Sequence, residues 1–123
     1  MKRRVLIVDD ERVIREVQAE YLQGLGYDVV VAESGAQALH ILNGPENDFA
    51  VAVVDWQMAG VNGRAVFELI RSRFPDTQVV ISTGRTSAEL SDQTVFRMGG
   101  SLLRKPFSLK TLGREVDRQL SRA

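Results

Sequence analysis

The sequence predicts an α/β fold, a doubly wound sheet of five parallel strands with five helices that cover both of its faces. Two observations support this prediction. Short apolar runs without polar alternation are typical of strands buried on both faces, and they lie at 5–8, 29–31, 51–54 and 79–81, with a weaker run at 102–103. Helical patterns lie between these runs, and strands that alternate with helices form parallel sheets.

The first three runs are each followed by an amphipathic pattern. We expect the first helix to bury one apolar face, formed by Ile14, Val17, Tyr21 and Leu25. Gly24 and Gly26 are expected to end this helix, because glycine is favoured at helix ends. Ser34 and Gln37 have the spacing of a capping box at the start of the second helix. The third helix is expected to stop before Pro75, which cannot continue it.

The last two predicted helices differ in strength. We expect the fourth to run from Ser87 to Met98 with Ser87 as its cap, and its polar composition predicts low local stability. Ser108 is expected to cap the fifth, whose apolar face carries Leu109, Leu112, Val116 and Leu120. The fourth helix is therefore the element that we expect to move in a conformational change.

The composition predicts one domain, residues 1–123, and excludes several classes of protein. Lys plus Arg number 16 and Asp plus Glu number 16, so the net charge of zero argues against direct binding of nucleic acid. The absence of cysteine excludes disulfides and thiolate metal sites. Only four apolar residues separate the basic N-terminus from Asp9, too few for a signal peptide or a membrane span. We expect a cytoplasmic protein without membrane insertion.

Reactive side chains follow several strands at the point where each strand ends. In an open parallel sheet, ligands bind beside the carboxyl ends of the strands. The side chains expected there are those of Asp9, Asp10 and Glu11 after the first strand, Asp55 after the third, Thr83 after the fourth and Lys105 after the fifth. The sequence therefore predicts carboxylates, a hydroxyl and an ammonium at one edge of the sheet.

The carboxylates of Asp9, Asp10 and Asp55 predict a cation site. Two like charges about 4 Å apart repel by roughly 4 kcal/mol at an effective dielectric constant of about 20, so such a cluster is strained without a cation. Oxygen ligands with no His or Cys nearby favour Mg²⁺, Mn²⁺ or Ca²⁺ over zinc. A few carboxylates with room for water and phosphate oxygens fit Mg²⁺ best.

The two remaining groups predict a phosphate site beside the cation. Lys105 offers a positive charge to phosphoryl oxygens, and the Thr83 hydroxyl offers a hydrogen bond. A carboxylate can itself be the nucleophile in phosphoryl transfer. Asp55 is the best candidate for this role because the third strand places it between the other groups.

Four motifs, in order along the chain, resemble the response-regulator receiver domain of two-component signalling, within the CheY-like superfamily. They are Val8-Asp9-Asp10-Glu11, Asp55-Trp56-Gln57-Met58 with Gly63, Ile81-Ser82-Thr83-Gly84 and Lys105-Pro106-Phe107. The resemblance covers essentially the whole chain and implies a flavodoxin-like fold with strand order 2-1-3-4-5. It also implies a phosphorelay function, in which a sensor histidine kinase or phosphotransfer protein donates a phosphoryl group and the resulting switch controls a protein partner.

The resemblance further implies a role for each site residue. Asp55 is the expected phosphoacceptor, in a self-catalysed Mg²⁺-dependent transfer followed by autodephosphorylation, rather than in ordinary enzymatic turnover. The implied metal ligands are Asp10, Asp55, the backbone carbonyl of Gln57 and, through water, Asp9. Thr83 and Lys105 are expected to hold the phosphoryl oxygens, and the bond from Lys105 to Pro106 is usually cis in this family.

Two positions depart from the pattern of the family. Ala59 stands where proline is usual, which loosens the loop by ~0.4–1 kcal/mol through the entropy of the unfolded chain. Leu102 stands where an aromatic residue usually moves together with the switch residue Thr83. A leucine packs but presents neither a ring nor a hydroxyl, so how Leu102 serves the switch is left open.

Further expectations concern the partner and the lifetime of the phosphorylated state. We expect the target protein to bind the face made by the fourth helix, the fifth strand and the fifth helix. Gln57 and Arg85 lie two residues after Asp55 and Thr83, where they flank the path of a water attacking the aspartyl phosphate. We expect Arg85 to shield the phosphoryl group.

Three alternatives remain open. A Mg²⁺-dependent phosphatase of the haloacid-dehalogenase kind also uses an aspartate nucleophile, but its second aspartate comes two residues later, where Glu11 follows Asp9. The second alternative is that the chain is a receiver-like interaction module that takes no phosphate. Leu102 is the only feature of the sequence that supports it. The third alternative is that the chain is a receiver cut from a longer protein, such as a hybrid histidine kinase.

Overall fold

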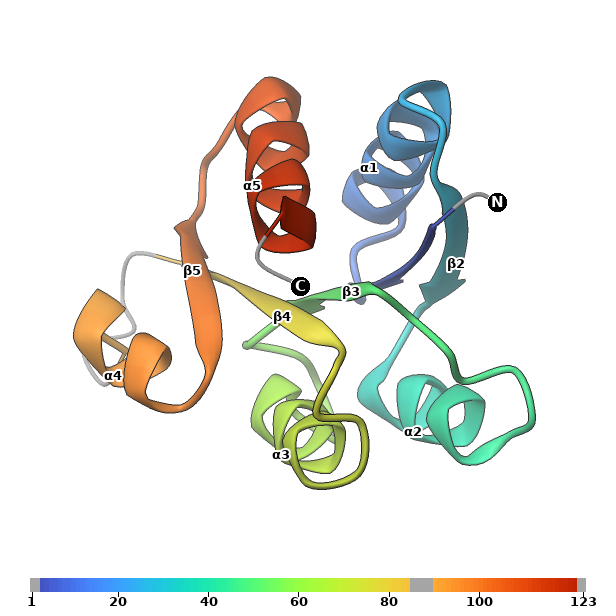
Figure 1. Ribbon diagram of the computed structural model, residues 1–123, viewed down its shortest axis with the longest axis vertical. Coiled ribbons are helices and arrows are strands. Elements are labelled where there is room, and N and C mark those ends of the chain that lie inside the picture. Colours follow the sequence, from blue (N-terminus) through green and yellow to red (C-terminus); the bar gives the residue numbers. More distant parts are fainter. Residues whose placement is uncertain (1–2, 85–89, 122–123) are drawn as a thin grey trace.

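The computed structural model describes residues 3–84 and 90–121, which form a five-stranded parallel sheet in the order β2-β1-β3-β4-β5 (Figure 1). The strands are β1 (Arg4–Val8), β2 (Asp28–Ala32), β3 (Val51–Asp55), β4 (Gln78–Thr83) and β5 (Gly100–Arg104). Each apolar run of the sequence lies within a strand, and the predicted fold class and strand order are confirmed.

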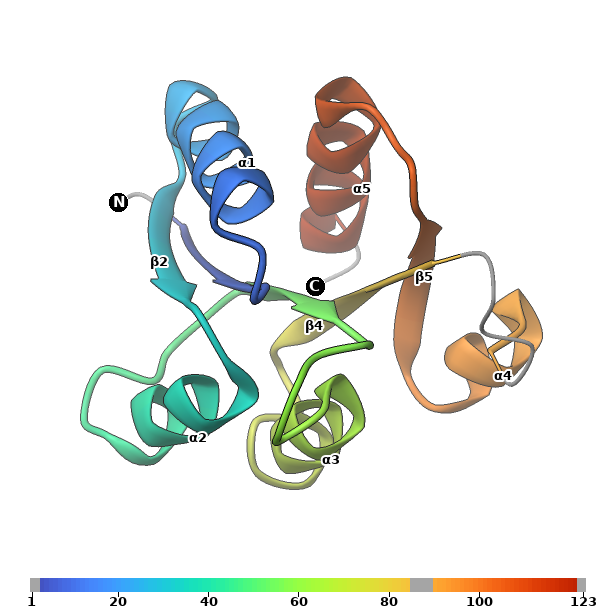
Figure 2. The ribbon, with the colours of Figure 1, turned by 180° about the vertical axis from the view of Figure 1, so that it is seen from behind.

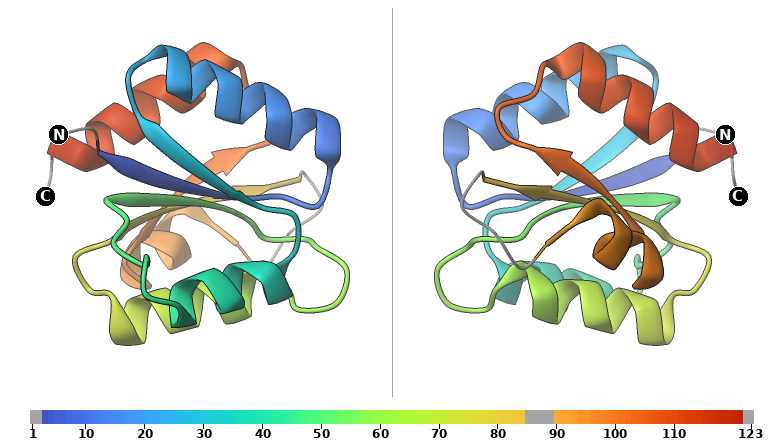
Figure 3. Two further views of the ribbon diagram at one scale, coloured as in Figure 1. Left: turned by 90° about the vertical axis from the view of Figure 1, so that its right-hand side faces the viewer. Right: turned by 90° about the vertical axis from the view of Figure 1, so that its left-hand side faces the viewer.

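The five described helices cover both faces of this sheet. They are α1 (Arg12–Gly24), α2 (Gly35–Asn43), α3 (Gly63–Arg73), α4 (Asp92–Arg97) and α5 (Leu109–Ser121). Helices α1 and α5 cover one face, and α2, α3 and α4 lie on the other (Figures 2 and 3). Alternate residues of β1 therefore enter two separate cores: Val5 and Ile7 pack with α1 and α5, whereas Leu6 and Val8 pack with α2 and α3.

Serine side chains cap several helices as the sequence predicts. The Ser34 hydroxyl accepts a hydrogen bond from the Gln37 amide at the start of α2, and Ser108 does the same for Thr111 at the start of α5. The fourth helix is shorter than predicted, because it begins at Asp92 and its cap is Ser91. Ser87, the cap that the sequence suggested, lies outside the described residues.

The buried face of α1 differs from the prediction. The residues of α1 that are buried are Gln18, Ala19 and Leu22. Val17 and Leu25, predicted to be buried, are 42% and 52% exposed, and Val13 is 71% exposed. The prediction was wrong because α1 carries two overlapping apolar stripes, and their periodicity does not indicate which one faces the sheet.

The two outer strands are also less buried than their composition suggests. Val31 of β2 is 41% exposed, and Leu102 and Leu103 of β5 are half-buried. Both strands lie at an edge of the sheet, and among residues 3–84 and 90–121 each has a strand neighbour on one side only. Only β1, β3 and β4 are buried almost throughout.

The strand register brings the carboxyl ends of the inner strands to one edge. Val8 pairs with Val54, Asp55 pairs with Ser82, and Thr83 pairs with Arg104. The residues that follow β1 and β5 therefore lie beside the end of β3. In the part of the chain that the structure describes, no helix has the length and apolar character needed to span a membrane.

Candidate functional site

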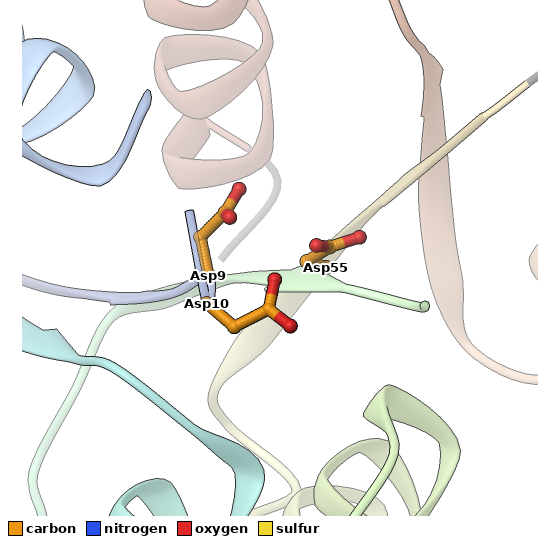
Figure 4. Close-up of side chains that lie close together, drawn as sticks. All are labelled: Asp9, Asp10 and Asp55. Carbon is orange, nitrogen blue, oxygen red and sulfur yellow. The ribbon is translucent and has the colours of Figure 1, made fainter. Parts of the chain in front are cut away.

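Three carboxylates meet at this edge of the sheet. Asp9 and Asp10 follow β1, and Asp55 is the last residue of β3 (Figure 4). One carboxylate oxygen from each lies within 4.8 Å of the others. The side chains of Asp9 and Asp55 are buried, with 2% and 3% of their surface exposed, whereas Asp10 faces solvent. The sequence prediction that these three residues gather is therefore confirmed.

Backbone amides hold each of these carboxylates in place. Asp9 Oδ1 accepts a hydrogen bond of 2.9 Å from the amide two residues later, that of Glu11. Asp55 Oδ1 accepts one of 3.3 Å from the amide of Gln57, which has the same spacing. Such bonds within a turn stabilise the ionised form of a carboxylate and fix its orientation.

Asp10 is held by a different loop. Its Oδ2 accepts a hydrogen bond of 3.3 Å from the amide of Ala59, in the loop between β3 and α3. This contact uses an N–H that proline lacks, so the departure from the family pattern at Ala59 supplies a donor to the site. This contact could not be predicted from the sequence, because its donor is a backbone amide and every residue except proline has one.

Lys105 places an ammonium between two of the carboxylates. Its Nζ lies 3.4 Å from Asp9 Oδ2 and 3.5 Å from Asp55 Oδ2. Its backbone amide donates a hydrogen bond of 2.7 Å to the Thr83 carbonyl, which fixes the chain just after β5 against the end of β4. The peptide bond between Lys105 and Pro106 is cis, as the resemblance implies.

The electrostatics of the site favour protonation of Asp55 to an unusual degree. The pKa of Asp55 is raised to about 6. Burial raises this pKa most, the ammonium of Lys105 lowers it, and the neighbouring Asp9 carboxylate raises it. Burial lowers the pKa of Lys105, but the charges of Asp55 and Asp9 outweigh this effect, so its pKa is raised. Lys105 is thus held firmly in its charged form.

Three other predicted residues lie at or near this edge. Thr83 ends β4 and is fully buried, and its hydroxyl donates to the Gly84 carbonyl at 3.5 Å, so it serves its own turn in this structure. Gln57 is exposed, and a Cβ added to Gly84 would lie 3.2 Å from its Oε1. Leu102 is half-buried in β5 and packs against the core under α3 and α4. Arg85 lies outside the described residues.

Two further residues shape the site from behind. The guanidinium of Arg15 in α1 donates a hydrogen bond of 2.9 Å to the backbone carbonyl of Asp9, a contact that the sequence does not signal because its acceptor is a backbone atom. Gly63, at the start of α3, is tight against the end of β3: an added Cβ would lie 2.3 Å from the carbonyl oxygen of Asp55. Glycine is required there by contact rather than by backbone angle.

The donor set fits a small divalent cation. Three carboxylates and one ammonium carry a net charge of −2 when all are ionised, and every ligand that the carboxylates offer is a hard oxygen. Because Asp10 faces solvent, the site also has access to water, which Mg²⁺ retains in most protein sites.

The chain is similar to known proteins in sequence. The sequence matches the family model described as "Response regulator receiver domain" over residues 5–117. It is 29% identical over 112 residues to the response regulator protein FleR of Pseudomonas aeruginosa, an alignment covering 91% of this chain and 23% of FleR. The curated relatives it matches are longer proteins, of which the chain spans between about a fifth and a half.

Solved structures give the same result for the fold. The receiver domain of the Francisella response regulator 1452 superposes with a TM-score of 0.85 at 28% identity, covering 98% of each chain. The response regulator TrrA of Thermotoga maritima, solved in complex with Mg²⁺-BeF, superposes with a TM-score of 0.80 at 32% identity, covering 98% of this chain and 100% of TrrA.

Proposed function

The chain belongs to the response regulator receiver family, and on this premise we propose that it accepts a phosphoryl group on Asp55 with the help of Mg²⁺. The observation that carries the proposal is the edge where the carboxylates of Asp9, Asp10 and Asp55 meet and where the ammonium of Lys105 pairs with two of them. The proposed phosphodonor is a histidine kinase or phosphotransfer protein of a two-component system, and the proposed location is the cytoplasm.

The carboxylates have separate roles in the proposed metal site. Asp10, Asp55 and the backbone carbonyl of Gln57 would ligate Mg²⁺ directly, and Asp9 would do so through water. When bound, Mg²⁺ neutralises charge on the transferring phosphoryl group and its oxygens. Asp10 is the carboxylate most open to solvent, which supports a place on the side of the site where the cation enters.

Asp55 acts as the nucleophile in the proposed transfer. A carboxylate oxygen of Asp55 attacks phosphorus while the bond from phosphorus to the donor breaks, and the donor leaves with the electron pair of that bond. With a pKa of about 6, Asp55 is mostly ionised at neutral pH and so carries the required lone pair. Lys105 would contact the phosphoryl oxygens and stabilise the charge on them.

The proposed switch starts at the two groups that contact the phosphoryl oxygens. Phosphorylation adds roughly −1.5 to −2 charges, which attract the hydroxyl of Thr83 and the ammonium of Lys105. The Thr83 hydroxyl would exchange its long bond to the Gly84 carbonyl for a phosphoryl oxygen. Because the backbones of Thr83 and Lys105 are hydrogen-bonded to each other, movement of one displaces the other, and Leu102 repacks in β5.

A groove on the face made by α4, β5 and α5 supports a place for the target protein. The groove is lined by Phe96 and Arg97 of α4, Leu102 of β5 and Arg118 of α5, and Phe96 is 67% exposed. We propose that the target binds here in a phosphorylation-dependent way. Amide exchange with and without a phosphoryl mimic tests this proposal, and unchanged exchange across residues 84–105 would contradict it.

A second groove, beside the site, supports a place for the phosphodonor protein. Val13 and Val17 of α1, with Phe107 and Leu109, line an apolar groove that reaches Lys105. A protein that brings a phosphohistidine to Asp55 covers this surface, because the groove is continuous with the site.

The donor groove can be tested with two kinds of donor. Val13→Ser should slow transfer from a phosphohistidine protein but not from a small acyl phosphate, and Val31→Ser, at an exposed valine of β2, is the matched control. Equal slowing by both substitutions, or slowing with the acyl phosphate, would argue against this surface.

We also propose that residues two positions after the key groups set the lifetime of the aspartyl phosphate. The side chain of Gln57 lies near Gly84, which supports a position across the path of an attacking water. Arg85 is proposed to shield the phosphoryl group. An unchanged rate of dephosphorylation in Arg85→Ala would remove Arg85 from this proposal.

The central proposal is tested by exposing the protein to an acyl phosphate and Mg²⁺ and measuring its intact mass. We expect a gain of one phosphoryl group that disappears in Asp55→Asn and in the presence of a chelator. The absence of any gain would favour an interaction module without phosphorylation, which only Leu102 supports at present. Multiple turnover of phosphate esters would instead indicate a phosphatase.

A further inference from the structure

Arg15 holds the peptide group that joins two of the acidic residues. It lies one turn into α1 and is half-buried, and its Nη1 donates a hydrogen bond of 2.9 Å to the backbone carbonyl of Asp9. That carbonyl belongs to the peptide plane between Asp9 and Asp10. Because the atoms of a peptide group are coplanar, fixing the carbonyl oxygen also fixes the direction in which the chain enters Asp10.

The other atoms of Asp9 are already held. Its amide donates a hydrogen bond of 3.2 Å to the Ala32 carbonyl, and its Oδ1 accepts the amide of Glu11. The hydrogen bond from Arg15 completes these restraints on the turn. The relative orientation of the Asp9 and Asp10 carboxylates therefore depends on Arg15, although its side chain reaches past them to a backbone atom.

The guanidinium binds no carboxylate of the cluster. Among the described residues, the ion pairs of Asp9 and Asp55 are with Lys105, and Arg15 forms none with the three carboxylates. Arg15 therefore occupies none of the carboxylate oxygens of Asp9, Asp10 and Asp55, while its guanidinium, a donor with five N–H groups in a rigid fork, holds the backbone behind them. Residues that orient metal ligands from behind commonly affect metal affinity by 10- to 100-fold.

We propose that Arg15 is a positioning residue for the Mg²⁺ site, acting through the peptide between Asp9 and Asp10. This inference rests on the proposed function. It makes a prediction whose sign is opposite to that of simple electrostatics. Removal of a positive charge near an acidic cluster should tighten the binding of a cation, whereas loss of the orientation of its ligands should weaken it.

The experiment compares two arginines of the same helix. Arg12 lies closer to the helix start and pairs with Glu16 in solvent, 3.0 Å away, without contact to the acidic turn. Mg²⁺ titration is followed by the fluorescence of Trp56, which is adjacent to Asp55, and by the Mg²⁺-dependent shift in the thermal midpoint. We expect Arg15→Met to raise the Kd for Mg²⁺ about tenfold. Arg12→Met should leave the Kd unchanged or lower it.

A conservative variant separates positioning from a general loss of structure. Arg15→Lys keeps the charge and one long donor, and we expect it to restore most of the affinity. Should Arg15→Met fail to fold, Arg15→Gln replaces it, since glutamine is too short to reach the Asp9 carbonyl. The inference is overturned if the Kd of Arg15→Met is equal to or below that of Arg12→Met. It is also overturned if Arg15→Lys binds Mg²⁺ as weakly as Arg15→Met does. If the wild-type protein shows no response to Mg²⁺, the proposed metal site itself fails, and the inference fails with it.

Discussion

The two ends of strand β1 differ in how well their charged groups are matched by interaction partners. At the amino end, the guanidinium of Arg4 lies 4.5 Å from the centre of the Phe49 ring and 3.6 Å from the carboxylate of Asp28. It also donates hydrogen bonds of 3.3 Å to the backbone carbonyls of Glu46 and Asp48. One cation is therefore matched by a ring, a carboxylate and two carbonyls.

At the carboxyl end of the same strand the charges are not matched. Of the three carboxylates that gather there, Asp9 and Asp55 share the ammonium of Lys105, and the pKa of Asp55 is raised to about 6 chiefly by burial. Folding thus satisfies charge at one end of β1 and concentrates unbalanced charge at the other. A surplus of like charge at a strand end is unfavourable for stability, and it is the arrangement that we expect where a cationic ligand binds.

The largest effect that we expect follows from removing the shared ammonium. Lys105→Met should lower the rate of phosphorylation by an acyl phosphate by about 100-fold, because one contact that stabilises the transferring group is lost. The rate is measured by intact mass over time at fixed Mg²⁺. Lys110→Met, at an exposed lysine of α5, is the matched control and should leave the rate unchanged. A normal rate in Lys105→Met would mean that the surplus charge has no part in phosphoryl transfer.

The next effect concerns the stability of the protein without metal. The pKa of Asp55 is higher in the folded chain, about 6, than its ordinary value of 3.8, so the folded state binds the proton more tightly. The stability that this proton contributes is fully present below about pH 4 and is lost as the pH rises through about 6. Asp55→Asn should therefore raise the free energy of unfolding at pH 7 by about 1–3 kcal/mol in the presence of a chelator.

The pH dependence gives this prediction its control. The difference between Asp55→Asn and the wild-type protein should shrink towards zero at about pH 4, where the wild-type carboxyl is neutral in the folded state. Urea unfolding at a series of pH values measures it. If Asp55→Asn is instead less stable than the wild type at pH 7, the charge of Asp55 is compensated by its neighbours in the folded state.

A smaller effect is expected at the opposite end of the strand. Arg4→Met should lower the free energy of unfolding by about 1–2 kcal/mol, since it removes a cation–π contact and two hydrogen bonds. The Kd for Mg²⁺ should stay the same. Arg114→Met, at an exposed residue of α5, is the control for the loss of one charge. A changed Kd for Mg²⁺ in Arg4→Met would show that the two ends of β1 are energetically coupled.

The smallest effect is expected at Ala59. Ala59→Pro restricts the unfolded chain, which adds about 0.4–1 kcal/mol of stability, but it removes the amide that holds Asp10, which costs about 0.5–1.5 kcal/mol. The two contributions nearly cancel, so the free energy of unfolding should change by less than about 1 kcal/mol. Unfolding in urea with a chelator present measures this change. A loss of about 3 kcal/mol or more would mean that the loop itself cannot accept proline.

Much of the fold and most of the acidic cluster could be predicted from the sequence. The inner strands are buried on both faces, so their composition alone identifies them, and the carboxyl ends of parallel strands meet by geometry. Asp9, Asp55 and Lys105 were predictable for this reason, as were the caps Ser34 and Ser108.

The remaining features depend on how elements pack, which local patterns do not encode. Val17 and Leu25 were predicted to be buried because two stripes of α1 are apolar, and the choice between them is made by the sheet and α5. The cap of α4 is Ser91 rather than Ser87, since two serines precede a weak helix. The contacts from the Ala59 amide and from Arg15 depend on the path of two loops, and neither residue type signals such a role.

The tight packing at Gly63 limits the directions in which the site can rearrange. An atom added there would lie 2.3 Å from the Asp55 carbonyl oxygen and 2.6 Å from Trp56 Cα, so the start of α3 is in close contact with the backbone at the end of β3. That side of the site is incompressible. A new covalent group on Asp55 must therefore be accommodated on the flank of Thr83 and Lys105, and we expect the molecule to yield in that one direction.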